Sequence, residues 1–254
     1  MKRILASAAF LLVSAVLMGQ ANTTPGMAAQ QVWGQKTLSY VNSATPTQFW
    51  FALEAVSGRC YCVETANYET GYGDKFMDTK LTVYRQDHAT PIVVNDDNNE
   101  EPKGYFLSRA CWVHNLPNET VFVKLAPSAS IVASNSTVSL RFLETTLFCP
   151  WFFVAGDYNA FSLIRNTSYT DLPGVVVTWR GLNGIVAGST TVTIPANGTV
   201  VLNARTFVNP ALFSNGSVEI AYPGAPDQLQ GSTTTLSGTT GLGFDALFTQ
   251  RKPW

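Results

Sequence analysis

Acidic side chains gather at the ends of two predicted strands in the first half of the chain. Asp78 opens the segment DTKLTVY, and Asp74 lies four residues before it in a Gly- and Asp-rich loop. Asp96 and Asp97 end the segment PIVVNDD. Calcium takes about six to eight oxygen ligands, many of them carboxylates, so these four residues are candidate ligands for Ca²⁺. Their spacing is not that of an EF-hand. The alternative is a set of solvated turns in which Asp and Asn bond to their own backbone.

Four cysteines form the second group with a chemistry of its own: Cys60, Cys62, Cys111 and Cys149. An even number of cysteines in an exported chain favours two disulfides. Cys60 and Cys62 are two apart in a strand pattern, so they face the same side, and we expect each to pair with Cys111 or Cys149. Which pairs with which stays open. A zinc site is the alternative, but C-x-C with two distant cysteines and only two histidines is a poor zinc pattern.

Catalytic arrangements are poorly supported by the residue types present. His88 and His114 are the only histidines, and no G-x-S-x-G elbow accompanies them. Glu54 and Glu64 lie on neighbouring predicted strands and could approach each other as a glycosidase carboxylate pair, although nothing else singles them out. Phosphate-loop, dinucleotide and zinc-protease motifs are absent. We therefore predict no catalytic residues.

Aromatic side chains are the remaining candidates for recognition. Exposed rings bind sugars and proteins through stacking and burial. Trp179 lies between Thr178 and Arg180, just before a hairpin turn, and is the best surface candidate, whereas Trp50 and Trp151 are expected in the core. Core packing is the alternative for Trp179 as well. The sequence therefore predicts Trp179 as a ligand-binding residue.

The segments that carry these candidate residues are predicted to be short β-strands. Apolar and polar residues alternate in TQFWFALEAV, RCYCVETA and STVSLRFLETT, and turn residues separate the runs. No stretch keeps a convincing helical period, so the pattern indicates a β-sandwich or barrel. Asn183-Gly184 and Asn197-Gly198 mark two tight turns, because Asn and Gly accept the positive φ angles that such turns need.

The N-terminus predicts export. Lys2 and Arg3 precede an apolar run that ends at Gly19-Gln20-Ala21, which is typical of a signal peptide over residues 1–21. The alternative is an uncleaved anchor, but a spanning helix needs about 20 apolar residues. Charged residues make up only 13% of the chain, so no basic face for nucleic acid is expected. The mature chain is predicted to be secreted, periplasmic or at the cell surface, with no membrane span.

Composition divides the rest of the chain into three parts. Residues 22–44 read as a leader or linker, and residues 45–148 as a first β-sandwich that carries most of the acidic loops. Residues 149–254 have few charges and many Thr, Gly and Val residues, which indicates a second sandwich. One continuous sandwich is the alternative.

Several segments of the first half carry a resemblance to a known family. They are Glu54-Ala55-Val56-Ser57-Gly58, the strand with Tyr61, Asp78-Thr79-x-Leu81-x-Val83-Tyr84, Asn95-Asp96-Asp97, and Thr120-Val121-Phe122-Val123-Lys124-Leu125. Residues 45–126 resemble the bacterial pre-peptidase C-terminal domain, a jelly-roll-like sandwich appended to exported proteins. The resemblance implies a bacterial origin and adds support for Ca²⁺ at the acidic loops. Related sandwiches bind collagen or carbohydrate.

Together these patterns predict an all-β protein of two β-sandwich domains, the first jelly-roll-like. We expect a non-catalytic binding or cell-surface interaction protein whose partner is a protein or a polysaccharide, with Ca²⁺ as the one candidate cofactor. The first alternative is a structural subunit of an extracellular assembly, because sheet edges with few charges can pair with neighbouring chains. A secreted hydrolase or a hydrolase accessory is the third hypothesis.

Overall fold

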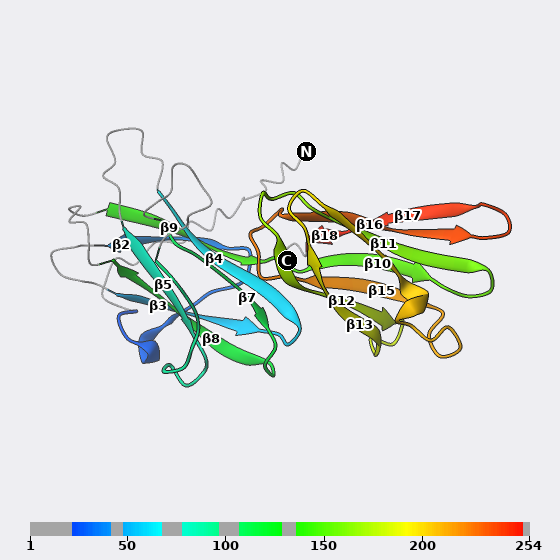
Figure 1. Ribbon diagram of the computed structural model, residues 1–254. Helices are drawn as coiled ribbons and strands as arrows, with labels where there is room; N and C mark the ends of the chain where they lie inside the picture. The colour runs from blue at the N-terminus through cyan, green and yellow to red at the C-terminus, as the bar shows by residue number, and fades with distance from the viewer. Residues whose placement is uncertain (1–21, 42–47, 68–77, 97–106, 129–135, 251–254) are drawn as a thin grey trace, which may run out of the picture.

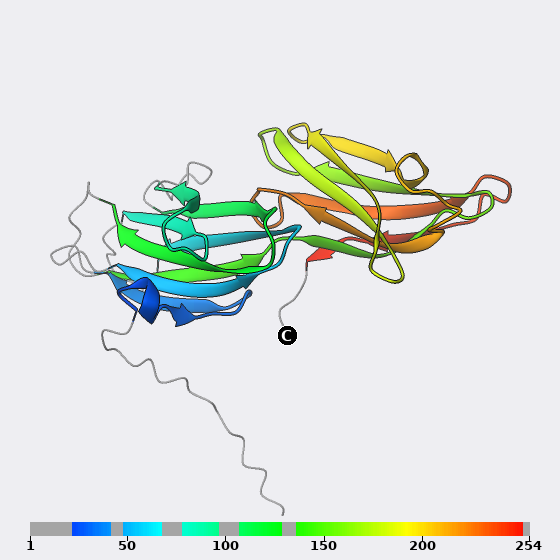
Figure 2. The same cartoon turned by 90° about the horizontal axis from the view of Figure 1, so that it is seen from below.

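The chain folds into two β-sandwiches that lie end to end (Figures 1 and 2). This computed structural model describes residues 22–41, 48–67, 78–96, 107–128 and 136–250. Strands β1 to β9 build the first sandwich and strands β10 to β18 the second. The all-β prediction with two sandwich domains is confirmed. The predicted signal peptide, residues 1–21, lies outside the described residues.

The first sandwich has one 3₁₀ turn and two sheets, with the orders β1-β3-β8-β5-β6 and β2-β9-β4-β7. The bounds of its elements are η1 Pro25–Met27, β1 Ala29–Gln30, β2 Lys36–Val41, β3 Phe49–Ala55, β4 Arg59–Asn67, β5 Thr79–Tyr84, β6 Pro91–Asn95, β7 Arg109–His114, β8 Glu119–Pro127 and β9 Ser136–Glu144.

The strand pairing in the first sandwich is that of a jelly roll. β2 pairs with β9, β3 with β8, β4 with β7 and β5 with β6, so the first half of the sandwich pairs with the second half in reverse order. A long hairpin rolled into two sheets produces this order. The jelly-roll-like prediction for this domain is therefore confirmed.

The prediction that residues 22–44 form a leader or linker is wrong, because this range contains the strands β1 and β2. β1 pairs in parallel with β3, and β2 pairs with β9, so one strand of this range joins each sheet. β1 has only two residues, too few to show a strand pattern of their own. Pairing with distant strands, not local pattern, makes them part of the sandwich.

The core of the first sandwich follows the two-residue period of its strands. Val121, Val123 and Leu125 on β8 are fully buried and alternate with half-buried residues. They pack against Phe51 of β3 and Phe142 of β9, whose rings lie 5.4 Å apart across the two sheets. Alternating faces of two sheets thus form one apolar layer.

The second sandwich has sheets with the orders β13-β12-β15-β10-β18 and β14-β11-β16-β17. The bounds of its elements are β10 Leu147–Phe153, β11 Tyr158–Asn166, β12 Leu172–Gly181, β13 Val186–Ile194, β14 Thr199–Asn203, η2 Ala204–Thr206, β15 Asn215–Ala221, β16 Leu229–Ser237, β17 Gly243–Leu247 and β18 Thr249–Gln250.

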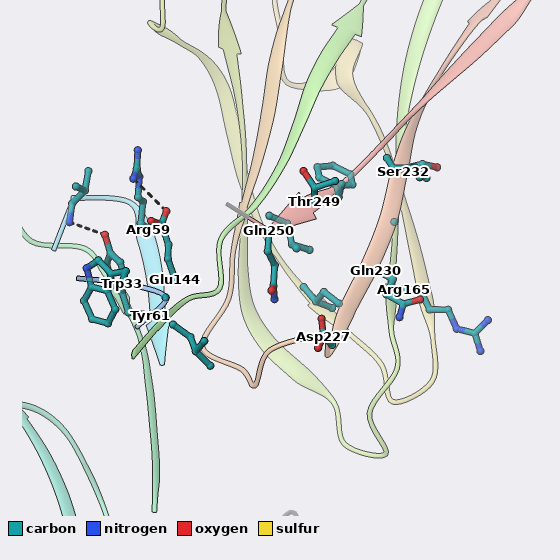
Figure 3. A pocket seen from close by; sticks show the side chains of 18 of the residues that line it. Trp33, Arg59, Tyr61, Glu144, Arg165, Asp227, Gln230, Ser232, Thr249 and Gln250 are labelled. Carbon is teal, nitrogen blue, oxygen red and sulfur yellow. Dashed lines mark hydrogen bonds and ion pairs between the residues drawn. The ribbon is translucent and has the colours of Figure 1, made fainter. Parts of the chain in front are cut away.

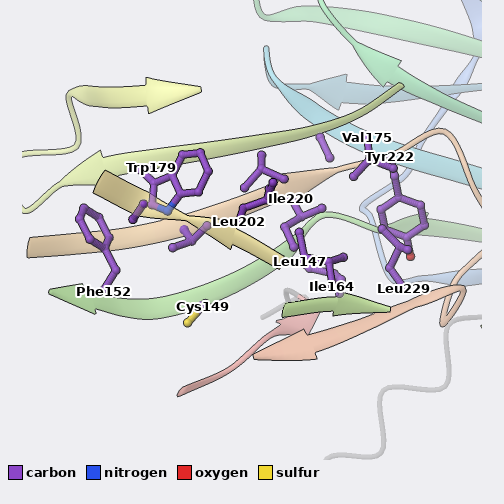
Figure 4. Packing of buried hydrophobic residues seen from close by; sticks show 14 of the residues in the cluster. Leu147, Cys149, Phe152, Ile164, Val175, Trp179, Leu202, Ile220, Tyr222 and Leu229 are labelled. Atoms are coloured by element: carbon purple, nitrogen blue, oxygen red, sulfur yellow. The ribbon is translucent and has the colours of Figure 1, made fainter. Parts of the chain in front are cut away.

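The second core is built around aromatic and aliphatic side chains from both sheets (Figure 4). Its tight turns use the two Asn-Gly pairs: Gly184 has φ 78° between β12 and β13, and Asn197 has φ 52° before β14. Both values lie in the left-handed region that these residue types tolerate. The two predicted turns therefore hold, although in the second the positive angle falls on Asn and not on Gly.

A short, buried joint links the two sandwiches. β9 ends at Glu144 and β10 begins at Leu147, and the two threonines between them, Thr145 and Thr146, are fully buried. The Thr145 amide donates to the Cys60 carbonyl at 2.9 Å, and the Thr146 hydroxyl accepts from the Cys60 amide at 3.0 Å. Cys60 lies on β4 but belongs to the core of the second sandwich. Because the sandwiches share buried residues, the joint is expected to hold them in one orientation.

Candidate functional site: a cleft between the two sandwiches

A cleft of about 1250 Å³ lies beside the joint and is lined by both sandwiches (Figure 3). One wall comes from the loop after β1 and from β3 and β4. The other comes from β11, β16, β18 and the loop before β16. The packed joint makes this cleft a preformed one. Ligand sites typically have volumes of about 300–1,000 Å³, so the cleft has room for a ligand larger than one small molecule.

The wall of the first sandwich carries an aromatic stack. Trp33 lies on Tyr61 with ring centroids 4.2 Å apart, and its edge meets Trp112 at 5.9 Å. Its indole N–H donates to the Glu54 carbonyl at 2.6 Å. Tyr61 and Trp112 are buried, whereas Trp33 is half-buried and lines the cleft. Trp33 is therefore held rigidly and offers ring surface rather than a free donor.

The wall of the second sandwich carries polar side chains from its sheet and from one loop. They are Arg165 on β11, Asp227 in the loop before β16, and Gln230 and Ser232 on β16. Within the described residues, none of these four side chains has a hydrogen-bond or ion-pair partner. The wall therefore presents donors and acceptors that are free to meet a ligand.

The charges at the base of the cleft are paired. Arg59 lies 3.3 Å from Glu144, and its guanidinium stands 5.8 Å from the centre of the Phe148 ring. Burial raises the pKa of Tyr61 to about 12, so its phenol stays protonated at neutral pH. Its hydroxyl accepts a hydrogen bond from the Val56 amide at 2.9 Å. These groups hold the first wall in shape.

Trp179 was wrongly predicted to be a surface residue. Its side chain is fully buried in the second core (Figure 4). It stacks on Phe207 with ring centroids 5.0 Å apart. It lies on β12, where Val175 and Val177 of the same face are buried too. The alternation of the whole strand places it inside, and its nearness to the turn does not bring it to the surface.

Two of the four predicted calcium ligands, Asp78 and Asp96, lie among the described residues. Asp78 is buried, and Asp96 lies 3.5 Å from Lys80 in an ion pair. Asp74 and Asp97 lie outside the described residues. In the described part of the chain, no group of three or more His, Cys, Asp or Glu side chains is placed to hold a metal ion. Calcium binding stays a prediction.

The cysteines form one disulfide, not the two that were predicted. Cys62 and Cys111 lie directly opposite each other on β4 and β7 and are bonded. Cys60 and Cys149 are both buried and both free. Burial raises the pKa of the Cys60 thiol, whose sulfur accepts a hydrogen bond from Thr145 at 3.1 Å. The expectation of two disulfides rested on the even number of cysteines. It was wrong because the register of β4 and β7 places only Cys62 opposite another cysteine, Cys111.

The disulfide lies at the junction of the two sandwiches. Cys62 Sγ is 3.1 Å from the carbonyl oxygen of Gly224, which belongs to the loop after β15. A disulfide sulfur has no proton to donate, so this is a close packing contact. Tyr222, in the same loop, is fully buried. The bond therefore stiffens the surface on which the second sandwich rests.

The residues considered for catalysis have structural partners instead. His114 is buried and its Nε2 lies 3.0 Å from the Pro117 carbonyl, while the His88 ring meets the edge of Phe122 at 4.1 Å. Glu54 is on β3 and Glu64 on β4, and these strands belong to different sheets. The expectation that the two carboxylates lie on neighbouring strands is therefore wrong.

Glu64 has two cationic partners of its own. Arg109 contacts it at 3.0 Å and Arg141 at 2.5 Å. Each oxygen of this buried carboxylate meets one arginine, so Glu64 serves as a structural ion-pair partner between β4, β7 and β9.

The cleft itself could not be found from sequence pattern. Trp33 stands in the range predicted to be a linker, and it reaches Tyr61 only because β1 and β2 join the sandwich. Asp227 precedes β16 and Gln230 is its second residue, more than 190 residues after Trp33, and this segment reads as an ordinary turn. In the structure Asp227 has a positive φ of 66°, which is typical of a turn, but this angle cannot be read from the sequence.

Comparisons with known proteins do not show a family for this chain. No family model matches it, and no curated protein matches it. The full extracellular region of zebrafish Gpr126/Adgrg6 aligns at 7% identity and a TM-score of 0.21, over 89% of this chain and 34% of that one. A glycosyl hydrolase family 2 member from Bacteroides cellulosilyticus aligns at 9% identity and 0.23, over 79% and 28%. The chain thus spans about a third of the first of these.

A protein from Parabacteroides distasonis aligns at 7% identity and a TM-score of 0.24, over 85% of this chain and 89% of that one. Likenesses this distant carry no argument about function. The resemblance of residues 45–126 to the pre-peptidase C-terminal domain stays a prediction. Across the described residues, no helix has the length and apolarity that crossing a bilayer requires.

Proposed function

We propose that the chain is an exported, non-catalytic binding protein that holds its ligand in the cleft between its two sandwiches. The observation that carries this proposal is the cleft, preformed by a buried joint and lined by residues of both sandwiches. Preformed concave sites at domain junctions are where proteins most often bind small ligands and cofactors.

The residues around the cleft suit binding better than chemistry. Its described lining contains neither histidine nor cysteine. Tyr61 stays protonated, and Glu144 is engaged with Arg59. An activated nucleophile next to a base, which most covalent mechanisms need, is not among these lining residues.

Filling the cleft is expected to abolish ligand retention. Ser232 lies on the outer face of β16 within the cleft, so Ser232→Trp places a large ring in the ligand volume. We expect retention on immobilised cell envelope, collagen or polysaccharide to fall at least tenfold. The matched control is Thr234→Trp, two residues along the same strand face and outside the cleft. Equal losses for the two variants, or no loss for Ser232→Trp, would reject the cleft as the binding site.

One strand favours the structural-subunit alternative. β17 forms the free edge of its sheet and has a single charge, Asp245, which accepts a hydrogen bond from Thr234. Phe244 and Leu247 are 44% and 69% exposed. Natural edge strands are usually protected by charges, prolines or bulges, and β17 has little of this protection.

Two backbone hydrogen bonds between β16 and the ends of β17 show which backbone groups of β17 face away from β16. Ser237 donates to the Leu242 carbonyl and Phe248 to the Gly231 carbonyl. Because antiparallel pairs alternate, the N–H and C=O groups of Gly243, Asp245 and Leu247 point away from β16. These three residues present an unpaired edge to a neighbouring chain.

If this edge pairs with another chain, Asp245→Pro is expected to prevent the association. Proline removes the outward N–H of residue 245 and leaves the bonds to β16 in place. Light scattering after size exclusion should show a mass that rises with concentration for the natural chain and for the control Asp245→Ala, but not for Asp245→Pro. A natural chain that stays monomeric at every concentration would count against the structural role.

A further inference from the structure

We infer that the cleft binds a neutral oligosaccharide of several sugar rings, with one ring stacked on Trp33 and its hydroxyls bonded to the opposite wall. This inference rests on the proposed function and names its ligand class. It is carried by the aromatic wall, the free polar groups opposite, the balance of charge and the volume of the cleft.

The aromatic wall suits the apolar face of a sugar ring. Trp33 is fixed by its stack on Tyr61 and by its N–H bond to the Glu54 carbonyl, so binding costs it little conformational freedom. The negative face of an aromatic ring attracts the slightly positive C–H groups that a pyranose exposes on one side. Since the indole N–H is already used, Trp33 selects for a flat C–H surface rather than for an acceptor.

The polar wall suits hydroxyl groups. Arg165 supplies donors, Asp227 supplies acceptors, and Gln230 and Ser232 supply both. A hydroxyl donates one hydrogen bond and accepts others, so a surface with both kinds of group in reach complements a polyol. Because these side chains have no partner among the described residues, the ligand would not need to break existing bonds.

The charges of the lining argue against a charged ligand. Two arginines and three carboxylates line the cleft, namely Arg59, Arg165, Glu54, Glu144 and Asp227. Arg59 and Glu144 neutralise each other at 3.3 Å. The remaining charges, one positive and two negative, set up no strong field of either sign. A polyanion or a polycation would find little electrostatic attraction here.

A peptide is the less favoured occupant. Extended peptides gain most of their affinity by adding a strand to a free sheet edge. The second wall is built mainly by β11 and β16, and each of them is already paired on both sides. The backbone groups of β11 and β16 are used within the sheet, so these two strands offer side chains. The edge strands β17 and β18 contribute only Leu247, Thr249 and Gln250 to the lining. The volume of about 1250 Å³ fits a chain of several rings better than one sugar.

The test is a titration of the folded mature chain by calorimetry. The probes are neutral hexasaccharides of glucose, mannose, xylose and N-acetylglucosamine, each with its monosaccharide, together with polygalacturonate and a collagen peptide. We expect at least one neutral hexasaccharide to bind, and its monosaccharide to bind at least tenfold more weakly. Trp33→Ala should weaken that binding at least tenfold, and Gln230→Ala about fivefold.

The matched control is Trp151→Ala. Trp151 is another half-buried tryptophan, which stacks near Phe153 and Phe244 away from the cleft. Unchanged binding in this variant with loss in Trp33→Ala supports the assignment. Equal losses in both variants would overturn it, and so would preferential binding of polygalacturonate.

The ligand class and the proposed function fail in different ways. If no hexasaccharide binds, while Ser232→Trp still abolishes retention on collagen or cell envelope, then the cleft is the site and the oligosaccharide class is wrong. If no hexasaccharide binds and Ser232→Trp changes no retention, both inferences are wrong.

Discussion

Replacement of Trp179 by alanine is expected to lower the free energy of unfolding by about 3–5 kcal/mol, as for other large buried aromatics. Among the described residues, Trp179 is the largest fully buried side chain, and it stacks on Phe207 with the ring planes 9° apart. Its removal leaves a cavity between β12 and η2 that the two packed sheets cannot close. Urea unfolding followed by far-UV circular dichroism measures the loss.

Two further variants test whether the stability loss at position 179 comes from the full burial of the tryptophan. Trp179→Phe keeps most of the apolar volume and should cost much less than the alanine variant. Trp151→Ala removes a half-buried ring of the same sandwich and should also cost less. A loss below about 1 kcal/mol for Trp179→Ala would contradict full burial, since that is the range of exposed sites.

Removal of the Cys62–Cys111 disulfide is expected to cost about 4 kcal/mol of stability by the chain-entropy relation for its 49-residue separation. The bond joins adjacent strands β4 and β7 and closes a loop that contains β5 and β6. The double variant Cys62→Ala with Cys111→Ala should therefore unfold at a clearly lower urea concentration than the natural chain. The control is Cys60→Ala, which removes a buried thiol without removing a cross-link.

A thiol count tests the pairing directly. The unfolded, unreduced natural chain should show two reactive thiols, from Cys60 and Cys149, and four after reduction. No reactive thiol before reduction would mean that a second disulfide forms and that the original expectation of two bonds was right. Equal stability of the double variant and the Cys60→Ala control would show that the Cys62–Cys111 bond adds nothing.

Strand pattern predicts much of this fold because each strand carries its own signal. The alternation in β8 and the Asn-Gly turn between β12 and β13 can be read from a few neighbouring residues. Short strands with exposed side chains cannot be predicted in this way. β17 and β18 have five and two residues, mostly exposed, so they show no buried face to reveal them.

The all-β class, the positions of most strands and the scarcity of charge can be read from the amino-acid sequence, because they depend on residue types a few positions apart. The burial of Trp179, the pairing of Cys62 with Cys111 and the placement of Trp33 and Gln230 on one cleft depend on how distant strands come together. Local alternation says which residues share a face of a strand. It does not say which strands pair, in what register, or where two sandwiches meet, and those three choices build the site.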